Sequence, residues 1–235
     1  MSNQNKVEIP QLKLSFKINN LRLTEKQKRF LALALHAETN IMFISGPAGS
    51  TKTYMAVYAA LRHLSSDEEL DMLYVRTVIE SGEKGLGALP GGIEDKINPY
   101  MAPLEDKLIE MLPQNKTVRQ ELLNTGRIQA MPINYLRGAS WKDKVVVADE
   151  AQNFTFKELT TLITRLGNNS KLFICGDFMQ SDINGRTGYR RMFDIFKDEE
   201  SSNKGVHAFS FNKDDILRSH LQRFIIARLE KEILT

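Results

Sequence analysis

The sequence has little of what marks a disulfide-stabilised or zinc-binding protein. Its 235 residues include one cysteine, Cys175, and four histidines that stand far apart. A single cysteine allows no internal disulfide, and the histidine spacing matches no structural zinc pattern. Cys175 lies within an apolar run, where cysteine usually acts as a small buried hydrophobe.

Long apolar runs and a strong excess of one charge are also missing. No run approaches the roughly 20 apolar residues that cross a membrane, and no secretory signal opens the chain. We therefore expect no membrane partner and a cytoplasmic location. Lysine and arginine total 32 against 29 acidic residues, a net charge of +3. No basic stripe of the kind that marks nucleic-acid binding stands out.

The length suits one well-buried α/β domain rather than two full domains. Apolar runs alternate with helical segments, which predicts a mostly parallel sheet with helices on both faces. Residues 1–20 are interpreted as an N-terminal arm, 21–235 as the domain, and 78–141 as a mainly helical insertion within it. Strands are expected near 41–45, 72–76, 145–149, 171–175 and 206–210.

The stretch 46–53, GPAGSTKT, nearly spells a phosphate-binding loop. A strand pattern precedes it and good helix formers follow, the context in which backbone N–H groups hold phosphate oxygens. Lys52 would reach the β- and γ-phosphates of a nucleotide, and the Thr53 hydroxyl would bind Mg²⁺. The residues expected around the nucleotide are Gly46, Pro47, Ala48, Gly49, Ser50, Thr51, Lys52, Thr53 and Tyr54.

Thr51 departs from this pattern, which has glycine immediately before the lysine. If the backbone there requires a positive φ, a β-branched residue costs about 1–2 kcal/mol. On the loop alone, an ordinary glycine-rich turn beside a core strand remains the alternative.

A second buried-strand pattern, 144–148, ends in the adjacent carboxylates of Asp149 and Glu150. In phosphate-loop NTPases an acidic residue at the end of a neighbouring strand holds Mg²⁺, and a second residue positions the attacking water. These are the roles expected of Asp149 and Glu150. Alone, the pair also suits a solvated loop or a helix N-terminus, and the upstream phosphate loop favours the NTPase.

A third apolar run, 171–175, is followed by a polar loop that contains Gln180. Ligands in open α/β sheets bind at the carboxyl ends of strands. Gln180 is therefore a candidate for contact with the γ-phosphate or the attacking water, although a plain turn explains the loop equally well.

Together these motifs resemble the ATPase core of superfamily 1 helicases, and resemble the PhoH-like (phosphate-starvation-inducible) ATPases more closely. The resemblance runs from about residue 20 to the C-terminus in consistent order. The motifs are 46–53, 76–84, 89–92, 98–100, 135–138, 149–153, 164–171 and 176–182.

The resemblance implies a single RecA-like P-loop NTPase domain with strand order 5-1-4-3-2, counting the five expected strands in chain order. It implies ATP and Mg²⁺ as cofactors and ATP hydrolysis as the activity. It also implies that Gln27 contacts the adenine edge. The residues themselves support another role for Gln27, because Thr24 and Gln27 have the spacing of a helix capping box.

One phosphate loop and one acidic strand end make half of a two-domain helicase site. We therefore expect a homo-oligomer, a hexamer by family analogy, in which a neighbouring subunit supplies an arginine. Arg218 matches a recurring arginine of the family and is the first choice, although a solvated surface charge is the common role of such a residue. The candidates are Arg165, Arg186, Arg190, Arg191 and Arg218.

The expected function is an oligomeric ATPase that unwinds or remodels RNA or single-stranded DNA. A nucleotide-gated binding or assembly module with slow hydrolysis is the alternative, and Thr51 favours it. A small-molecule kinase fits less well, because adjacent carboxylates suit activation of water.

Overall fold

The structure, a computed structural model, describes most of the domain. The described residues are 16–18, 22–77, 93–133, 141–180, 187–212, 215 and 228, with backbone alone for 93–99. Several sequence-predicted features lie outside them: most of the arm, the motif residues 78–84, 89–92, 135–138 and 181–182, Arg186, and Arg218 with its helix.

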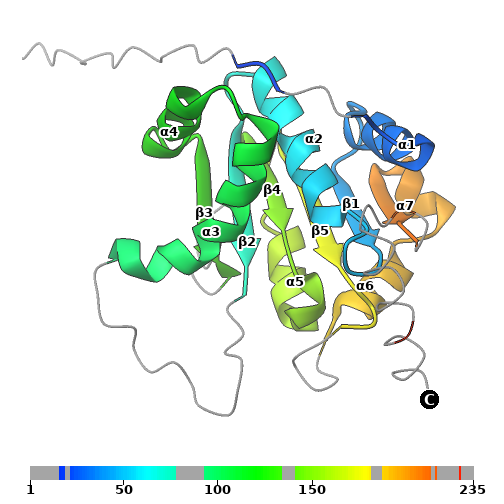
Figure 1. The fold of residues 1–235 in the computed structure, drawn as a ribbon. Helices are drawn as coiled ribbons and strands as arrows, with labels where there is room; N and C mark the ends of the chain where they lie inside the picture. The colour runs from blue at the N-terminus through cyan, green and yellow to red at the C-terminus, as the bar shows by residue number, and fades with distance from the viewer. Residues whose placement is uncertain are drawn as a thin grey trace, which may run out of the picture.

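A six-stranded parallel sheet forms the centre of the molecule (Figure 1). The strands are β1 (Ile41–Ser45), β2 (Asp71–Arg76), β3 (Ile128–Pro132), β4 (Lys144–Ala148), β5 (Lys171–Gly176) and β6 (Val206–Ser210). Their order is β3-β2-β4-β5-β1-β6, and every paired strand runs parallel to its neighbour. The expected α/β class with a mostly parallel sheet is confirmed, and the five predicted strands all form.

The strand order differs from the expected one by the addition of β3 at the sheet edge. This strand pairs with β2, and its side chains alternate between buried, as at Ile128 and Ala130, and exposed, as at Gln129. Such alternation is typical of an edge strand with one solvated face. The segment 78–141, expected to be mainly helical, thus contains a strand as well as the helices α3 (Ile93–Met111) and α4 (Lys116–Asn124).

Helices cover both faces because successive strand residues point to opposite sides of the sheet. Met42 and Cys175 belong to the apolar cluster that packs against α1 (Glu25–Ala34), α2 (Lys52–Ser66), α3 and α4. Phe43 and Ile174 belong to the cluster that packs against α5 (Phe156–Ile163) and α6 (Tyr189–Ile195). A short 3-10 helix, η2 (Ala151–Asn153), follows β4, and α7 (Glu199–Asn203) precedes β6. None of the helices in the described part of the chain is long and apolar enough to cross a bilayer.

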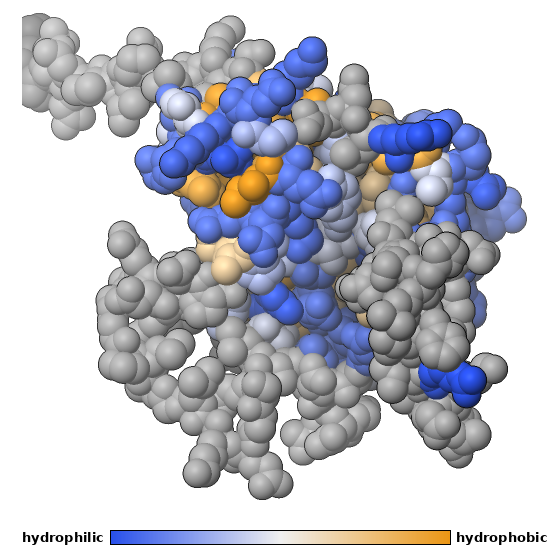
Figure 2. Space-filling view, in the orientation of Figure 1, coloured by the Kyte–Doolittle hydropathy of each residue, from blue (hydrophilic) through white to orange (hydrophobic). Residues whose placement is uncertain are grey.

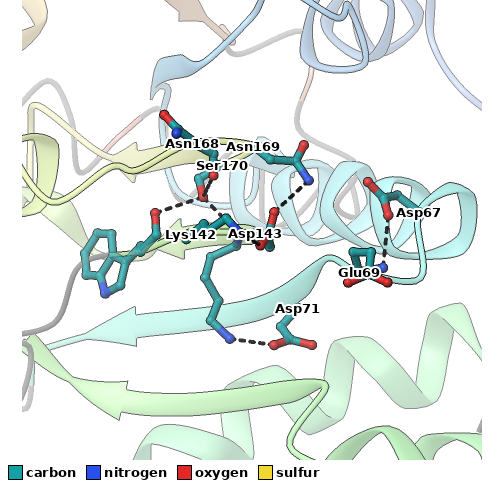
Figure 3. A network of polar contacts seen from close by, with 10 residues as sticks. Asp67, Glu69, Asp71, Lys142, Asp143, Asn168, Asn169 and Ser170 are labelled. Atoms are coloured by element: carbon teal, nitrogen blue, oxygen red, sulfur yellow. Dashed lines mark hydrogen bonds and ion pairs between the residues drawn. The ribbon is translucent and has the colours of Figure 1, made fainter. Parts of the chain in front are cut away.

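A polar network ties together the amino ends of β2 and β4 and the turn before β5 (Figure 3). The Lys144 ammonium lies 2.5 Å from the Asp71 carboxylate, and the Asn169 amide donates to Asp143 at 3.0 Å. Ser170 donates its hydroxyl to the Trp141 carbonyl at 3.0 Å. These contacts fix the strand ends that lie away from the phosphate loop.

The described surface in Figure 2 is mainly hydrophilic, with small separate apolar patches. Among the described residues, the large hydrophobic side chains that are exposed are Ile109 and Ile195. Single exposed apolar residues are ordinary on a soluble fold, so they define no docking face.

Candidate functional site

The loop between β1 and α2 has the predicted strand–turn–helix geometry. Ser45 ends the buried strand, and Lys52 begins the 15-residue helix. Gly49 has a φ of 78°, which glycine adopts without the Cβ clash of other residues. At Gly46 an added Cβ would lie 2.7 Å from Ser50 Oγ and 2.9 Å from Phe211 Cβ, so a side chain has no room. The unpaired N–H groups of the helix start make this loop suitable for an anion.

Thr51 has a φ of 66° and a ψ of 12° and so occupies the left-handed region. The steric cost expected for a threonine here depends on a positive φ, and the backbone has one. A β-branched residue in this region carries a steric penalty on the order of 1–2 kcal/mol.

Gln27 contacts Thr51 directly. Its amide Nε2 donates to Thr51 Oγ1 at 3.0 Å, while its Oε1 accepts from the backbone N–H of Thr24 at 2.9 Å. The predicted capping box of α1 is confirmed, because Thr24 Oγ1 also accepts from the Gln27 N–H. Gln27 is only 2% exposed. Its two amide hydrogen bonds join the start of α1 to the phosphate loop. Its contact with an adenine edge stays a prediction.

The Lys52 ammonium lies against the loop itself. Nζ donates to the carbonyl oxygens of Gly46 at 2.6 Å and Pro47 at 2.9 Å. Burial lowers the pKa of Lys52, and the nearby Asp177 carboxylate is the largest influence in the opposite direction. The cation is therefore held at the mouth of the loop, where a phosphate would be bound.

Thr53 and Asp149, 96 positions apart in the sequence, meet at the carboxyl edge of the sheet. Thr53 Oγ1 lies 2.5 Å from Asp149 Oδ1. The other carboxylate oxygen accepts a hydrogen bond from the Tyr74 hydroxyl at 2.5 Å. Asp149 is buried, and burial together with the Asp149 charge raises the pKa of Tyr74 well above its ordinary value. The phenol therefore stays protonated and donates to the carboxylate.

This oxygen pair fits Mg²⁺. The ion prefers hard oxygen ligands, and in nucleotide sites it takes one or two from the protein and the rest from phosphate and water. A hydroxyl and a carboxylate side by side at a phosphate loop supply that set. Within the described part of the chain no cluster of three or more His, Cys, Asp or Glu side chains could bind an ion by itself.

Glu150 follows Asp149 and has a φ of 56°, again in the left-handed region. The Gln152 amide donates to Glu150 Oε2 at 2.5 Å, and Arg76 Nη2 lies 3.6 Å from Oε1. A hydrogen bond and an ion pair from different elements thus hold the half-exposed carboxylate. Glu150 is predictable from the sequence, whereas its contacts with Arg76 and Gln152 are not.

The loop after β5 is joined to the same arrangement. The backbone N–H of Asp177 donates to Gln152 Oε1 at 3.0 Å, so Gln152 links the ends of β4 and β5. Asp177 is buried and accepts from the Met179 N–H at 2.9 Å. Gln180 is exposed and faces the cavity described next.

These residues line one cavity of about 490 Å³ at the carboxyl ends of the strands, a size within the range of small-molecule sites. Of the predicted site residues, Ala48, Gly49, Thr51, Lys52, Thr53, Tyr54, Asp149, Glu150 and Gln180 line it. Gly46, Pro47 and Ser50 belong to the loop beside it, Gln27 lies behind Thr51, and Arg218 is outside the described residues. The lining residues that the sequence motifs did not predict are Arg76, Pro103, Lys107, Gln152, Cys175, Gly176 and Asp177.

The candidate arginines that the structure describes, Arg165, Arg190 and Arg191, do not line this cavity. Arg190 and Arg191 on α6 stack over the rings of Phe178 and Phe156, at 5.2 Å and 4.6 Å from the ring centroids. The Arg165 carbonyl accepts from the Trp141 N–H, near the amino end of β4 and away from the phosphate loop. Arg76 is the arginine found among the described residues that line the cavity.

Comparison with known proteins identifies relatives across most of the chain. The family described as PhoH-like protein matches residues 21–230. A PhoH-like protein of Mycobacterium tuberculosis is 36% identical over 205 residues, covering 86% of this chain and 56% of the relative. The Bacillus subtilis PhoH-like protein is 34% identical over 200 residues, covering 85% and 61%. Protein PhoH of Escherichia coli K12 is 31% identical over 186 residues, covering 77% and 50%. The chain thus spans about half to three fifths of these relatives.

Solved helicase structures also align with this chain. Bacteroides Pif1 in complex with ADP-AlF4 aligns with 88% of this chain and 45% of its own, at a TM-score of 0.40 and 15% identity. The Pyrococcus furiosus Hef helicase domain aligns with 81% of this chain and 38% of its own, at a TM-score of 0.42 and 15% identity.

Proposed function

Because the chain belongs to the PhoH-like protein family, and because its phosphate loop stands beside a carboxylate suited to Mg²⁺, we propose that it binds and hydrolyses ATP. The observation that carries this proposal is the meeting of Thr53 and Asp149 at 2.5 Å next to the Lys52 ammonium. A plain glycine-rich turn provides no reason for that meeting.

Phosphate binding is assigned to the loop 46–51 and the start of α2. The loop N–H groups and the helix N-terminus would hold phosphate oxygens, and Lys52 would exchange its carbonyl partners for the β- and γ-phosphates. Thr53 and Asp149 would hold Mg²⁺, which, when bound, would neutralise phosphate charge. The Tyr74 hydroxyl would keep the Asp149 carboxylate oriented.

Water activation is assigned to Glu150. Its carboxylate is held by Gln152 and Arg76 at the edge of the cavity, where it would accept a proton from, or orient, the attacking water. Gln180 also faces this cavity and would contact the water or the γ-phosphate. The released products would be ADP and inorganic phosphate.

Assembly is proposed to complete the site. The described cavity contains Arg76, which is engaged with Glu150, so a further arginine to stabilise the transition state would come from a neighbouring subunit. A homohexamer with Arg218 in this role is the favoured arrangement, by analogy with the family resemblance. By the same analogy, ATP hydrolysis is proposed to drive the unwinding or remodelling of RNA or single-stranded DNA.

A nucleotide-gated assembly module is the second candidate. The left-handed threonine, at the position where the common loop pattern has glycine, favours it. Such a module would bind ATP, change its assembly or partner contacts, and hydrolyse slowly.

Steady-state phosphate release tests the proposal. It is measured with Mg²⁺-ATP, with and without single-stranded RNA and DNA, over a range of protein concentrations. A motor with shared sites gives stimulated turnover that rises more than linearly with protein. Slow, unstimulated turnover with ATP-dependent assembly supports the module. Absence of Mg²⁺-ATP binding contradicts both, and phosphate transfer to an acceptor other than water identifies a kinase.

A further inference from the structure

A second lysine faces the phosphate cavity from a helix that the proposed mechanism does not use. Lys107 and Pro103, one turn apart on α3, line the cavity together with the phosphate loop. Helix α3 lies next to α2 on the same face of the sheet (Figure 1). The cavity therefore has a wall from the segment between β2 and β3, and that wall carries a cation.

The orientation of α3 is fixed by its packing. Leu104, Leu108 and Met111 are fully buried in the core cluster that also contains the apolar face of α2. The Tyr54 hydroxyl, in the first turns of α2, donates to the Glu110 carboxylate, and burial with that negative charge raises the pKa of Tyr54. These contacts hold the Lys107 side of α3 toward the start of α2.

The Lys107 ammonium is half-buried and donates to the Pro103 carbonyl at 2.8 Å. A carbonyl is a neutral acceptor, and a lysine has a flexible stem and three donors. Exchange of this acceptor for a phosphate oxygen would pair the ammonium with an anion, so that both the donor and the acceptor are charged.

The other cations that line the cavity, Arg76 and Lys52, lie against other partners than Lys107 does. Arg76 lies near Glu150, and Lys52 is at the mouth of the loop. Cys175, which lines the cavity, is buried, and burial raises the pKa of its thiol, whereas the positive charges of Lys52 and Lys107 lower it. The two ammonium groups therefore act on the same end of β5 from different helices.

We propose that Lys107 binds the terminal phosphate of the nucleotide, so that α3 responds to the difference between a triphosphate and a diphosphate. This inference rests on the proposed nucleotide site. The loop N–H groups would hold phosphates common to both nucleotides, and Lys52 would reach the β- and γ-phosphates. Lys107 would add a contact that only the γ-phosphate of a triphosphate can make. Lys107 is thus a specificity-determining residue.

Equilibrium binding of Mg²⁺-ATPγS and Mg²⁺-ADP to the full chain tests this inference. In Lys107→Met we expect the Kd for ATPγS to rise about tenfold and the Kd for ADP to change less than twofold, since a hydrogen bond to a charged group contributes about 1.5 kcal/mol or more. Lys107→Arg should restore most of the ATPγS affinity. Lys116→Met, which removes the same charge from the exposed start of α4, should bind both nucleotides as wild type.

The ratio of the two Kd values is the decisive quantity, because partial loss of folded protein changes the number of sites and not this ratio. An unchanged ratio in Lys107→Met overturns the role of Lys107, whether both affinities fall together or neither does. Wild-type protein that binds neither nucleotide overturns the proposed function as well, so the two failures are distinguished.

Discussion

The Gln27 amide donates a hydrogen bond of 3.0 Å to the hydroxyl of Thr51, 24 positions further along the chain. Thr51 is the left-handed residue that opens α2, and Gln27 is buried at the start of α1. The hydrogen bond therefore ties the least favourable backbone position of the phosphate loop to a neighbouring helix. It offsets part of the steric cost, because a net contribution of about 0.5–1.5 kcal/mol is typical of such a bond.

Replacement of Thr51 should have opposite effects on stability in two backgrounds. In wild type, Thr51→Gly should lower the free energy of unfolding by about 1 kcal/mol, because a buried Gln27 donor loses its acceptor. In Gln27→Ala the same change should raise it by about 0.5–1 kcal/mol, because only relief of the left-handed strain remains. Urea denaturation of the four proteins measures the coupling.

Thr51→Ser is the matched control for this cycle. It keeps the hydroxyl that accepts from Gln27 and removes the β-branch, so its stability should stay within about 0.5 kcal/mol of wild type. Equal effects of Thr51→Gly in both backgrounds would show that the hydrogen bond contributes nothing to the loop.

Two substitutions should separate nucleotide binding from hydrolysis. Lys52→Ala should weaken Mg²⁺-ATP binding roughly 10- to 100-fold, because a cation that pairs with phosphate is lost. Glu150→Gln should bind within about threefold of wild type and lower kcat by about 10²- to 10⁴-fold, as loss of a general base does. Binding calorimetry and phosphate release measure the two. Glu199→Gln, on exposed α7, is the control, and full turnover in Glu150→Gln would remove the assigned role.

Tyr74→Phe should raise the Mg²⁺ concentration that gives half-maximal ATPase activity about tenfold. The Tyr74 hydroxyl orients the Asp149 carboxylate, and loss of an outer partner typically costs 10- to 100-fold in metal affinity or activity. A Mg²⁺ titration of phosphate release measures this. Tyr189→Phe serves as control, because its buried hydroxyl donates to the Ile174 carbonyl instead. Equal Mg²⁺ requirements in Tyr74→Phe and wild type would contradict the positioning role.

His63 should make the fold less stable as the pH falls. Its Nε2 lies 3.0 Å from the Ala34 carbonyl, which can only accept, and burial lowers the pKa of the ring below the ordinary 6.5. The charges that act on it are Lys171, which lowers the pKa, and Asp67, which raises it. The native state thus favours the neutral ring, so the contribution is complete above about pH 6.5 and is lost as the pH falls through the lowered pKa.

Unfolding by urea at pH 8 and pH 5.5 measures this dependence. The free energy of unfolding should fall more between these pH values in wild type than in His63→Gln, which keeps an amide donor. Burial also lowers the pKa of His207, but this histidine is present in both proteins and cancels in the comparison. Identical pH dependence in the two proteins would show that His63 does not contribute.

The parts of the site that follow from local patterns could be predicted from the sequence. The apolar runs of β1 and β4 each end in a short motif, and parallel strands bring their carboxyl ends to one edge. The meeting of Thr53 and Asp149 is therefore predictable from the sequence. The steric cost at Thr51 was also expected, because glycine occupies its position in the common loop.

The remainder depends on packing between distant segments. Strand β3 is short and half-exposed and ends in Pro132, so its sequence has no buried-strand pattern. Lys107 reaches the cavity because Leu104 and Leu108 pack α3 against the core beside α2, and no local pattern specifies that neighbour. The partners of Glu150 require the register of β2 with β4, which pairs Val75 with Ala148.

Within the described part of the chain, four non-glycine residues have a positive φ: Thr51, Asp143, Glu150 and Asn169. Asp143 and Asn169, at the amino ends of the strands, are of the types that tolerate this conformation. Thr51 and Glu150, at the carboxyl ends, are not. Backbone strain is therefore concentrated where chemistry is proposed, the usual origin of a stability–activity trade-off. Directed evolution for heat resistance alone should accumulate glycine or asparagine at position 150, and the heat-resistant variants should be the ones that no longer turn over ATP.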